Sequence, residues 1–217
     1  MKLPADLIAK VAHLESIDDY QLATVERFCD LLLRTNRQIN LISRAGDVGR
    51  EIERQLLLSL AVLPRLPIDR SLRWIDVGSG GGFPAIPLAI FRSGDRFDLV
   101  ESVAKKSFFL ERTSEALGLT NVAVLNCRIE ELIAKPTPRD SLYNWMSVKA
   151  VAGWLDNLHW GHDLLASDGH LVTYKPTGPS EDDLAAIESN GFELINMFSL
   201  EQVVADITTK VVILKKM

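Results

Sequence analysis

Residues 74–83, Trp-Ile-Asp-Val-Gly-Ser-Gly-Gly-Gly-Phe, lead from a short apolar segment into a turn with four glycines in five positions. Glycine is common where the backbone takes a positive φ or approaches a ligand closely. The apolar run 86–91 follows at once and contains Pro87, with Pro84 just before it; proline in the first turn is typical of a helix start. A strand, a glycine turn and a helix in this order predict a site for a nucleotide-like cofactor.

Two details narrow the choice of cofactor. No Gly-Lys-Ser/Thr follows the glycines, which disfavours a P-loop that grips nucleotide phosphates. Asp76 lies two residues before Gly78, where a carboxylate would repel a pyrophosphate but can hold water or a cationic amino group. S-adenosylmethionine carries an ammonium, a carboxylate and a sulfonium and no phosphate, so the pattern favours this methyl donor over NAD.

The next expected strand supplies a second test of this interpretation. Residues 97–101 end in Glu101, 23 residues after Gly78, where a carboxylate can accept hydrogen bonds from two ribose hydroxyls. An adenosyl cofactor is therefore expected. The alternative is a tight turn of purely structural importance, with Glu101 as an ordinary surface residue.

Composition sets broader limits on the class of protein. A chain of 217 residues suffices for one α/β domain with an appended element. The net charge of −5 disfavours a non-specific nucleic-acid binder but leaves room for a local basic face, and five arginines between residues 34 and 54 form either such a face or a solvated helix surface. Cys29 and Cys127 are in no metal-ligand spacing, so we expect reduced thiols and no metal.

The location of the protein is also an expectation from sequence. No apolar run approaches the roughly 20 residues that a membrane span needs. The first residues lack the long apolar stretch of a secretory signal. We therefore expect a cytoplasmic protein without membrane association.

The elements that position these residues fall into two parts. Residues 1–70 are expected to form a small helical extension, because apolar residues recur there at helical spacing, and residues 71–217 one globular cofactor-binding domain. The expected strands are 73–77, 97–101, 121–126, 143–148, 169–174, 192–198 and 207–214. The expected helices of this domain are 84–92, 104–117, 129–134, 151–165 and 181–190.

Alternating strands and helices imply a mostly parallel sheet with helices on both faces. The last two expected strands are joined by a short connection, which leaves no room for a crossover helix, so they should pair antiparallel. A Rossmann-like, doubly wound, seven-stranded sheet closed by an antiparallel hairpin is the arrangement of class I methyltransferases. Ligands of such sheets bind beyond the carboxyl ends of the strands, where residues 76–83, Glu101 and the turns after Val124 and Ser147 would converge.

The residues near that edge bear on the methyl acceptor. Methylation of an exocyclic amine usually needs an Asn/Asp-Pro-Pro-aromatic clamp, and residues 144–149 instead read Asn-Trp-Met-Ser-Val-Lys. Methylation of a pyrimidine carbon needs a thiolate, and we interpret Cys127 as structural. A ring nitrogen such as guanine N7 has an in-plane lone pair and needs mainly alignment with the methyl group. No catalytic side chain is then expected.

Several longer blocks of sequence resemble one family. They are Asn36-Arg-Gln-Ile-Asn-Leu, Ile75-Asp-Val-Gly-Ser-Gly-Gly-Gly-Phe-Pro-Ala-Ile-Pro-Leu-Ala-Ile and Val100-Glu-Ser-Val-Ala-Lys-Lys-Ser-Phe-Phe-Leu. They resemble the RsmG family, also called glucose-inhibited division protein B, and the likeness spans about residues 20–215. The resemblance implies a methyltransferase that uses S-adenosylmethionine and acts on guanine N7 of bacterial 16S ribosomal RNA. The expected partner is 16S ribosomal RNA or the small ribosomal subunit, and we expect a monomer.

The resemblance also implies residues of the site. Gly78 and Phe83 would line the cofactor, Glu101 would face its ribose, and Ile129 and Glu130 would border the adenine. With these, our predicted cofactor-binding residues are Asp76, Gly78, Gly80, Phe83, Glu101, Ile129, Glu130 and Lys149. The predicted substrate-binding residues are Arg128, Lys149 and Lys175. Arg128 could instead pair with a neighbouring acid, and Trp154 and Trp160 are interpreted as core and rim residues of a helix.

Three departures from the family's usual pattern lie near the expected acceptor side. Lys149 stands where the family usually has arginine, Lys175 is followed by proline rather than glycine, and Gln55 begins a segment that is usually His-x-x-Asp. A lysine lacks the planar fork with which arginine grips a carboxylate or phosphate. Two alternatives therefore stay open: a methyltransferase for a small molecule or a protein, and a non-catalytic binding protein with the same fold.

Overall fold

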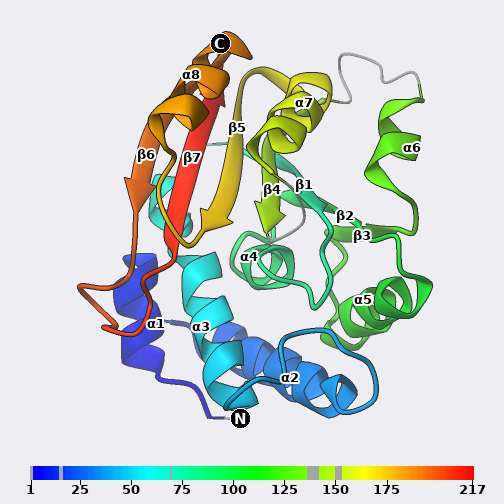
Figure 1. Ribbon diagram of the computed structural model, residues 1–217. Helices are drawn as coiled ribbons and strands as arrows, with labels where there is room; N and C mark the ends of the chain where they lie inside the picture. Colours follow the sequence, from blue (N-terminus) through cyan, green and yellow to red (C-terminus); the bar gives the residue numbers. More distant parts are fainter. Residues whose placement is uncertain (1, 15–16, 69, 136–141, 150–152) are drawn as a thin grey trace.

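The computed structural model describes residues 2–14, 17–68, 70–135, 142–149 and 153–217 (Figure 1). Its helices are α1 (Ala5–Ala12), α2 (Asp19–Asn36), α3 (Val48–Leu60), the 3-10 helix η1 (Leu63–Arg65), α4 (Ala85–Phe91), α5 (Ala104–Leu117), α6 (Ile129–Ile133), α7 (Trp154–Leu164) and α8 (Glu181–Ser189). Its strands are β1 (Arg73–Val77), β2 (Arg96–Val100), β3 (Val122–Leu125), β4 (Tyr143–Lys149), β5 (Leu165–Lys175), β6 (Phe192–Phe198) and β7 (Lys210–Lys216).

The strands form one seven-stranded sheet in the order β3-β2-β1-β4-β5-β7-β6. β1 pairs parallel with β2 and β4, whereas β7 lies between β5 and β6 and runs antiparallel to both. The predicted α/β class, the mostly parallel sheet and the closing antiparallel hairpin are confirmed. The switch in connection direction lies between β1 and β4, so a ligand site is expected beyond the carboxyl ends of these strands.

The bounds of some elements differ from the expected ones. β5 begins at Leu165, four residues before the expected start, and β7 begins at Lys210 rather than at 207. Ile207 is buried within the connection before β7, which explains why its apolar side chain reads as strand. Residues 151 and 152 of the helix expected over 151–165 lie outside the described residues.

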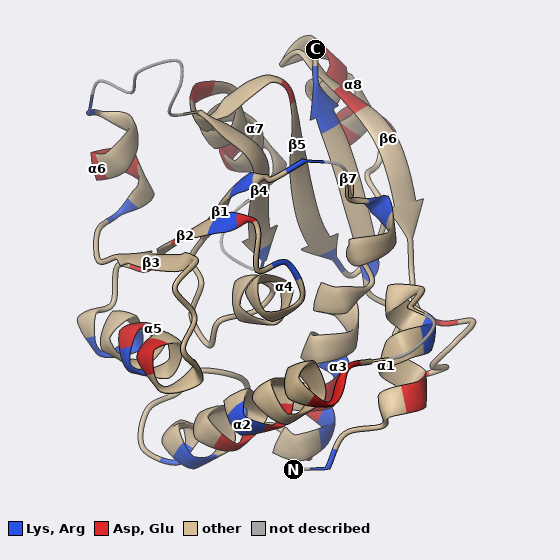
Figure 2. Ribbon diagram, turned by 180° about the vertical axis from the view of Figure 1, so that it is seen from behind, with Lys and Arg blue, Asp and Glu red and all other residues tan. Residues whose placement is uncertain are grey.

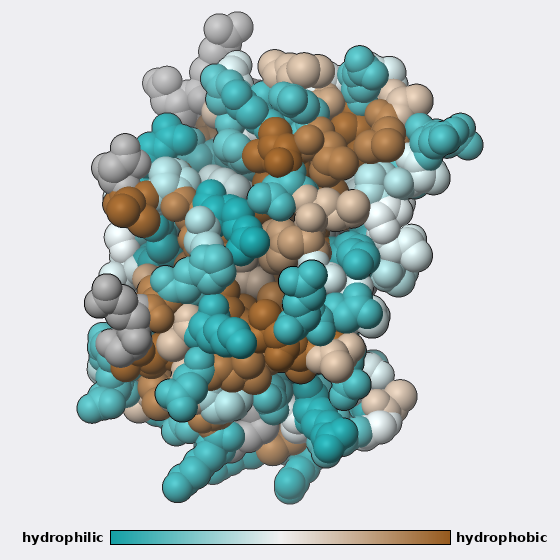
Figure 3. Space-filling model, turned by 90° about the vertical axis from the view of Figure 1, so that its left-hand side faces the viewer, coloured by the Kyte–Doolittle hydropathy of each residue, from teal (hydrophilic) through white to brown (hydrophobic). Residues whose placement is uncertain are grey.

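The sheet separates two layers of helices because successive strand residues point to opposite faces. Trp74 of β1 belongs to a hydrophobic cluster shared with the helices of residues 5–117, and Ile75 belongs to a second cluster shared with α7 and α8. Figure 3 shows the side on which β6 and α1 lie, where apolar side chains reach the surface among hydrophilic ones; Ile195 and Met197 of β6 are exposed. The molecule is thus a three-layer sandwich with its core on both faces of the sheet (Figure 1).

The predicted helical extension packs directly against the predicted glycine turn. The buried amide oxygen of Asn36, at the end of α2, accepts hydrogen bonds from the backbone N–H of Leu41 (2.9 Å) and Ile42 (3.1 Å). A Cβ atom at Gly81 would stand 3.1 Å from Ile42 Cγ2 and 3.4 Å from the Leu41 carbonyl oxygen. The two parts share one hydrophobic cluster, and the boundary at residue 70 stays a prediction.

The charged residues of these helices are mixed in sign. Acidic and basic positions are interspersed along α2 and α5 in Figure 2, so neither helix presents a face of one charge. Arg54 pairs with Glu51 on α3, with the Arg54 Nη2 to Glu51 Oε1 distance at 2.7 Å. Of the arginines between residues 34 and 54, Arg54 therefore forms an ion pair within its own helix.

Gly82 provides a test of how tightly the glycine turn is packed. Its φ is +91°, and an added Cβ would stand 2.8 Å from Ile86 Cγ1. We expect Gly82→Ala to lower the free energy of unfolding by about 2–4 kcal/mol, from backbone strain plus overpacking. Urea unfolding measures this change.

A matched glycine supplies the control. Gly118 ends α5 at a φ of +70°, and no described atom lies within 4 Å of an added Cβ. Gly118→Ala should cost only the backbone strain, about 1–2 kcal/mol. Equal losses for the two variants would contradict close packing around Gly82.

Candidate functional site

The glycine turn is held against the end of the neighbouring strand. Gly78 and Gly80 adopt φ values of +72° and +52°. The backbone N–H groups of Gly78 and Ser79 both donate to the Val100 carbonyl oxygen, at 2.8 and 3.1 Å. The turn therefore keeps a fixed position at the carboxyl edge of β1 and β2, with little side-chain bulk above it.

Glu101 links the turn to the start of α5. Its side chain is 5% exposed; Oε2 accepts from the Gly80 N–H (2.9 Å) and Oε1 from the Val103 N–H (2.8 Å). An ionised carboxylate offers about four acceptor positions, so two hydrogen bonds leave capacity for two hydroxyl donors. The sequence predicted a ribose contact for Glu101; its part in fixing the turn follows from the structure.

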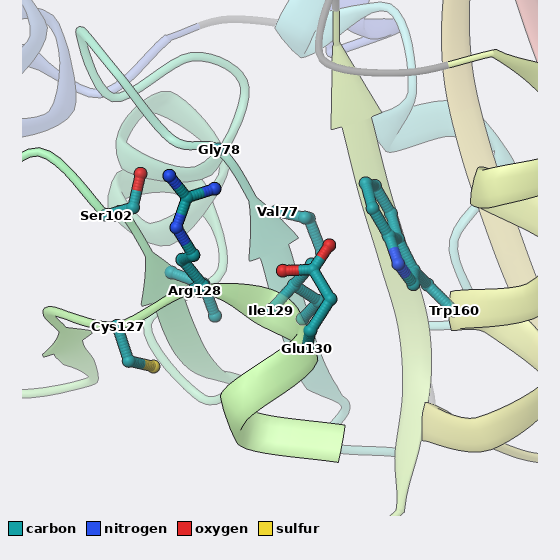
Figure 4. A pocket seen from close by; sticks show the side chains of 9 residues that line it. Val77, Gly78, Ser102, Cys127, Arg128, Ile129, Glu130 and Trp160 are labelled. Carbon is teal, nitrogen blue, oxygen red and sulfur yellow. The ribbon is translucent and has the colours of Figure 1, made fainter. Parts of the chain in front are cut away.

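A cavity of about 110 Å³ opens beside this turn at the carboxyl ends of β1 and β2 (Figure 4). This volume is below the usual range for a whole small-molecule site, about 300–1,000 Å³, so the cavity encloses only part of a ligand of that size. The cavity is lined by Val77, Gly78, Val100, Ser102, Cys127, Arg128, Ile129, Glu130 and Trp160. It thus brings together four of the predicted site residues from β1 and the start of α6.

Figure 4 shows how the charged side chains lie in this cavity. The Arg128 guanidinium points toward Ser102 and Gly78, and the Glu130 carboxylate points toward Val77. Trp160 presents its ring from the far side, from α7. The cavity therefore combines apolar walls with one cation and one anion.

Five cavity residues were not among the predicted site residues: Val77, Val100, Ser102, Cys127 and Trp160. Ser102 follows Glu101 with no motif of its own, and Trp160 was interpreted as a core or rim residue of its helix. Trp160 comes from α7, the helix after β4, which packs against α6 and so brings this ring to the cavity. Topology, rather than local pattern, was the available signal.

Other predicted residues lie outside the lining of this cavity. Phe83 is buried and its ring meets that of Phe28 edge-on, with centroids 5.2 Å apart. The Lys175 ammonium lies 4.9 Å from the centre of the Trp154 ring, and partial burial lowers its pKa. Phe83 thus joins the turn to α2, whereas Lys175 lies at the end of β5 beside α7.

Asp76 is a buried carboxylate on the sheet face opposite Ile75. It is 2% exposed, and its Oδ1 accepts a hydrogen bond of 2.6 Å from the Ser147 hydroxyl on β4. Its Oδ2 has no hydrogen-bond partner among the described residues. Burial raises the pKa of Asp76 to about 6, because the charged form loses its hydration.

A second buried group near Asp76 is also without a partner. The Tyr174 hydroxyl on β5 makes no hydrogen bond within the described part of the chain. Burial is the larger cause of the raised pKa of Tyr174, and the nearby Asp76 charge raises this pKa further. Buried polar atoms without a hydrogen-bond partner are rare in native structures. The Asp76 carboxylate and the Tyr174 hydroxyl could therefore each bind a polar ligand or a water molecule.

Lys149 connects the same sheet face to α3. Its ammonium donates to the Gln55 amide oxygen and lies 5.2 Å from the centre of the Phe83 ring. Burial lowers the pKa of Lys149 to about 8, and the Asp76 carboxylate partly opposes that shift. The two strands therefore present one carboxylate and one ammonium on one face, at the carboxyl edge of the sheet.

The arrangement can hold a molecule with an apolar ring system and a separate charged end. The described residues include no group of three His, Cys, Asp or Glu that could bind a metal ion. Within the same described ranges, no helix has the length and apolar character to cross a membrane.

The chain is similar in sequence to one family over most of its length. A family model described as GidB, rRNA small subunit methyltransferase G, matches residues 21–206. A protein of Marinobacter nauticus named ribosomal RNA small subunit methyltransferase G is 36% identical over 185 residues, which are 85% of this chain and 81% of that one. A protein of the same name from Cronobacter sakazakii is 32% identical over 189 residues, 87% of this chain and 83% of that one.

Solved structures share the fold at low sequence identity. A SAM-dependent methyltransferase from Aquifex aeolicus has a TM-score of 0.56 at 16% identity and covers 73% of this chain and 89% of its own. The [4+2]-cyclase SpnF has a TM-score of 0.60 at 13% identity and covers 90% of this chain and 95% of its own. Proteins with different chemistries thus share this architecture, so the fold by itself leaves the reaction open.

Because the Asp76 carboxylate is buried, we expect its replacement by a neutral side chain to stabilise the protein, and to do so more at higher pH. Its pKa rises from 3.8 to about 6 on folding, so the native state favours the protonated form. The free energy of unfolding that this group contributes is fully present below pH 4, and it is lost as the pH rises through 6. Asp76→Asn removes this loss, and its advantage over the wild type should grow by about 1–2 kcal/mol between pH 5 and pH 7.5.

Urea unfolding of the ligand-free protein at the two pH values measures this difference. The Asp156→Asn variant, at an exposed position on α7, is the control for removal of a carboxylate elsewhere in the protein. An Asp76→Asn effect that is the same at both pH values would show that the carboxyl is not held above its ordinary pKa.

Proposed function

The chain belongs to the rRNA small subunit methyltransferase G family, also called GidB, and on that premise we propose that it methylates guanine N7 in 16S ribosomal RNA with S-adenosylmethionine as donor. Transfer of a methyl group from this donor to small-subunit ribosomal RNA is the activity that the family match carries. Guanine N7 is the finer part of the proposal. The match over residues 21–206 is the observation on which it chiefly rests.

We assign the adenosine half of the donor to the cavity beside the glycine turn, which would enclose part of it. We assign the adenine to the wall formed by Ile129, Glu130 and Trp160, where apolar and aromatic surface meets a carboxylate. The ribose hydroxyls are assigned to Glu101, whose oxygens retain acceptor capacity. Gly78 and Gly80 let the donor pass close to the backbone.

The amino-acid end of the donor is a zwitterion and needs a site with both charges. The unpartnered Oδ2 of Asp76 is assigned to the ammonium, and the Lys149 ammonium to the carboxylate. Both groups lie at the carboxyl edge of adjacent parallel strands. Phe83 would then contribute through its contact with the Lys149 ammonium, and it would not touch the adenosine.

The reaction needs alignment rather than proton transfer. The guanine N7 lone pair attacks the methyl carbon, the carbon–sulfur bond breaks, and sulfur leaves with the electron pair as a neutral thioether. The positive charge moves from sulfur to the base, so no proton leaves and no general base is required. Holding the two reactants in line can supply several kcal/mol of the barrier reduction.

Contacts to RNA are assigned to cations near the cavity. Arg128 is exposed at the start of α6, and Lys175 lies at the carboxyl end of β5. Both can meet backbone phosphates, which position an RNA without specifying its sequence. We further propose a monomer in the cytoplasm without a metal requirement, since a ribosomal substrate is cytoplasmic in bacteria.

Transfer of labelled methyl from S-adenosylmethionine tests the proposed activity. We expect label in 16S RNA when the protein is incubated with small subunits from a strain that lacks the mark, and nuclease mapping should recover it as N7-methylguanosine. Label in a protein or a small molecule would support the other acceptor classes. Donor binding without transfer to any of them would indicate a binding protein.

Glu101 provides a test of the assigned ribose contact. Glu101→Gln removes the charge of the acceptor, and hydrogen bonds to charged groups contribute about 1.5–3 kcal/mol. We therefore expect calorimetry to show donor affinity lowered roughly 10- to 100-fold. The control is Glu111→Gln, at an exposed position on α5. Unchanged affinity in Glu101→Gln would mean that the ribose lies elsewhere.

A further inference from the structure

The contact between Lys149 and Gln55 joins residues 94 positions apart and sets where a buried ammonium lies. Gln55 offers a neutral amide oxygen, so the hydrogen bond holds the ammonium without cancelling its charge. The other side of the same amide is also fixed, because its N–H donates to Glu51 Oε1 at 2.6 Å. Gln55 is thus held in one orientation by α3 itself.

The remaining charges around Lys149 are accounted for by α3 and β1. Glu51 makes a two-point contact with Arg54, at 2.8 and 2.7 Å, and Arg54 reaches Thr209 before β7 at 3.0 Å. Two acids raise the pKa of Lys149: Glu51, which is engaged by Arg54, and Asp76 on β1. No ion pair joins Lys149 to Asp76 in the described ranges, although each shifts the pKa of the other.

Inside a protein, an ammonium and a carboxylate attract each other more strongly than in water. Without a restraint, the flexible lysine side chain would close onto the free oxygen of Asp76. A closed pair would satisfy both charges internally and would compete with any ligand that carries the same two charges. The Gln55 contact works against this closure because it directs the Lys149 ammonium toward α3.

We propose that Gln55 is a positioning residue that holds Lys149 apart from Asp76, so that the two charges stay available for the zwitterionic end of the methyl donor. This inference rests on the proposed function, because it takes S-adenosylmethionine as the ligand. Glu51 orients the Gln55 amide, and Arg54 with Thr209 fixes Glu51. Helix α3 thereby takes part in donor recognition, although it lies outside the cavity that would take the adenosine.

Gln55→Leu tests this role, because leucine has a similar size and no hydrogen-bonding group. Calorimetry compares two ligands: S-adenosylmethionine, and 5′-methylthioadenosine, which has the nucleoside and the sulfur but no amino-acid end. We expect the variant to bind S-adenosylmethionine at least tenfold more weakly and 5′-methylthioadenosine as the wild type does. Glu53→Gln on the same helix is the matched control, since Glu53 takes no part in the chain of hydrogen bonds that runs from Thr209 through Arg54, Glu51 and Gln55 to Lys149.

A pH profile separates positioning from a general structural effect. Burial lowers the pKa of Lys149 to about 8 in the observed arrangement; Asp76 and Glu51 raise it, and Arg54 lowers it. Closure onto Asp76 would raise that pKa further. The alkaline loss of donor affinity should therefore move to higher pH in Gln55→Leu than in the wild type, and equal profiles would count against the proposal.

Gln55→Glu is a second variant that keeps a hydrogen-bond acceptor for Lys149. Its carboxylate would neutralise the ammonium, so donor affinity should fall again while 5′-methylthioadenosine binding stays at the wild-type level. This variant decides the question if Gln55→Leu does not fold. Equal losses for both ligands, or unchanged donor affinity in either folded variant, would overturn the role of Gln55. A wild-type protein that binds neither ligand would instead contradict the proposed function.

Discussion

The buried carboxylate of Asp76 is the constraint around which the site is organised. Loss of hydration disfavours its charged form, and one hydrogen bond from Ser147 compensates only in part. The chain supplies a distant cation, Lys149, and holds it on α3 rather than on the acid. An incompletely paired buried charge lowers the stability of a folded protein. Such charges are common at binding sites, where the ligand completes the pairing. The glycine turn, the Glu101 hydrogen bonds and the helical layer keep the surroundings of this charge in place.

Local patterns in the sequence were sufficient for the architecture, and they indicated several residues that lie together at the carboxyl edge of the sheet. The alternation of strands and helices gave the sheet class, and the short connection before the last strand gave its direction. Gly78, Arg128, Ile129 and Glu130 line the cavity as expected of neighbours at the carboxyl edge of parallel strands. The predictions of the sheet class and of the closing hairpin succeeded because each depends on residues near one another in the chain. The assignment of the cavity residues to the donor stays a proposal.

Interactions between distant segments were beyond the reach of these patterns. The Gln55–Lys149 contact, the position of Trp160 and the packing of Phe83 against Phe28 each depend on how α2, α3 and α7 lie on the sheet. Sequence periodicity shows that a helix has a buried face, but it does not show which strand that face meets. The same limit explains the predicted boundary at residue 70, which divides the sequence where the structure has a shared hydrophobic cluster.

The proton balance of donor binding tests the central claim most directly, namely that Asp76 receives the ammonium of S-adenosylmethionine. Because the pKa of Asp76 is about 6 in the ligand-free protein, the carboxyl is about half protonated at that pH and must ionise when a cation binds. Calorimetric titration at pH 6, in buffers with different ionisation enthalpies, counts the protons exchanged. We predict release of about half a proton per donor bound in the wild type, from this half-protonated carboxyl, and none from this group in Asp76→Asn. Binding with no proton release, or with the same release in both proteins, would contradict the account.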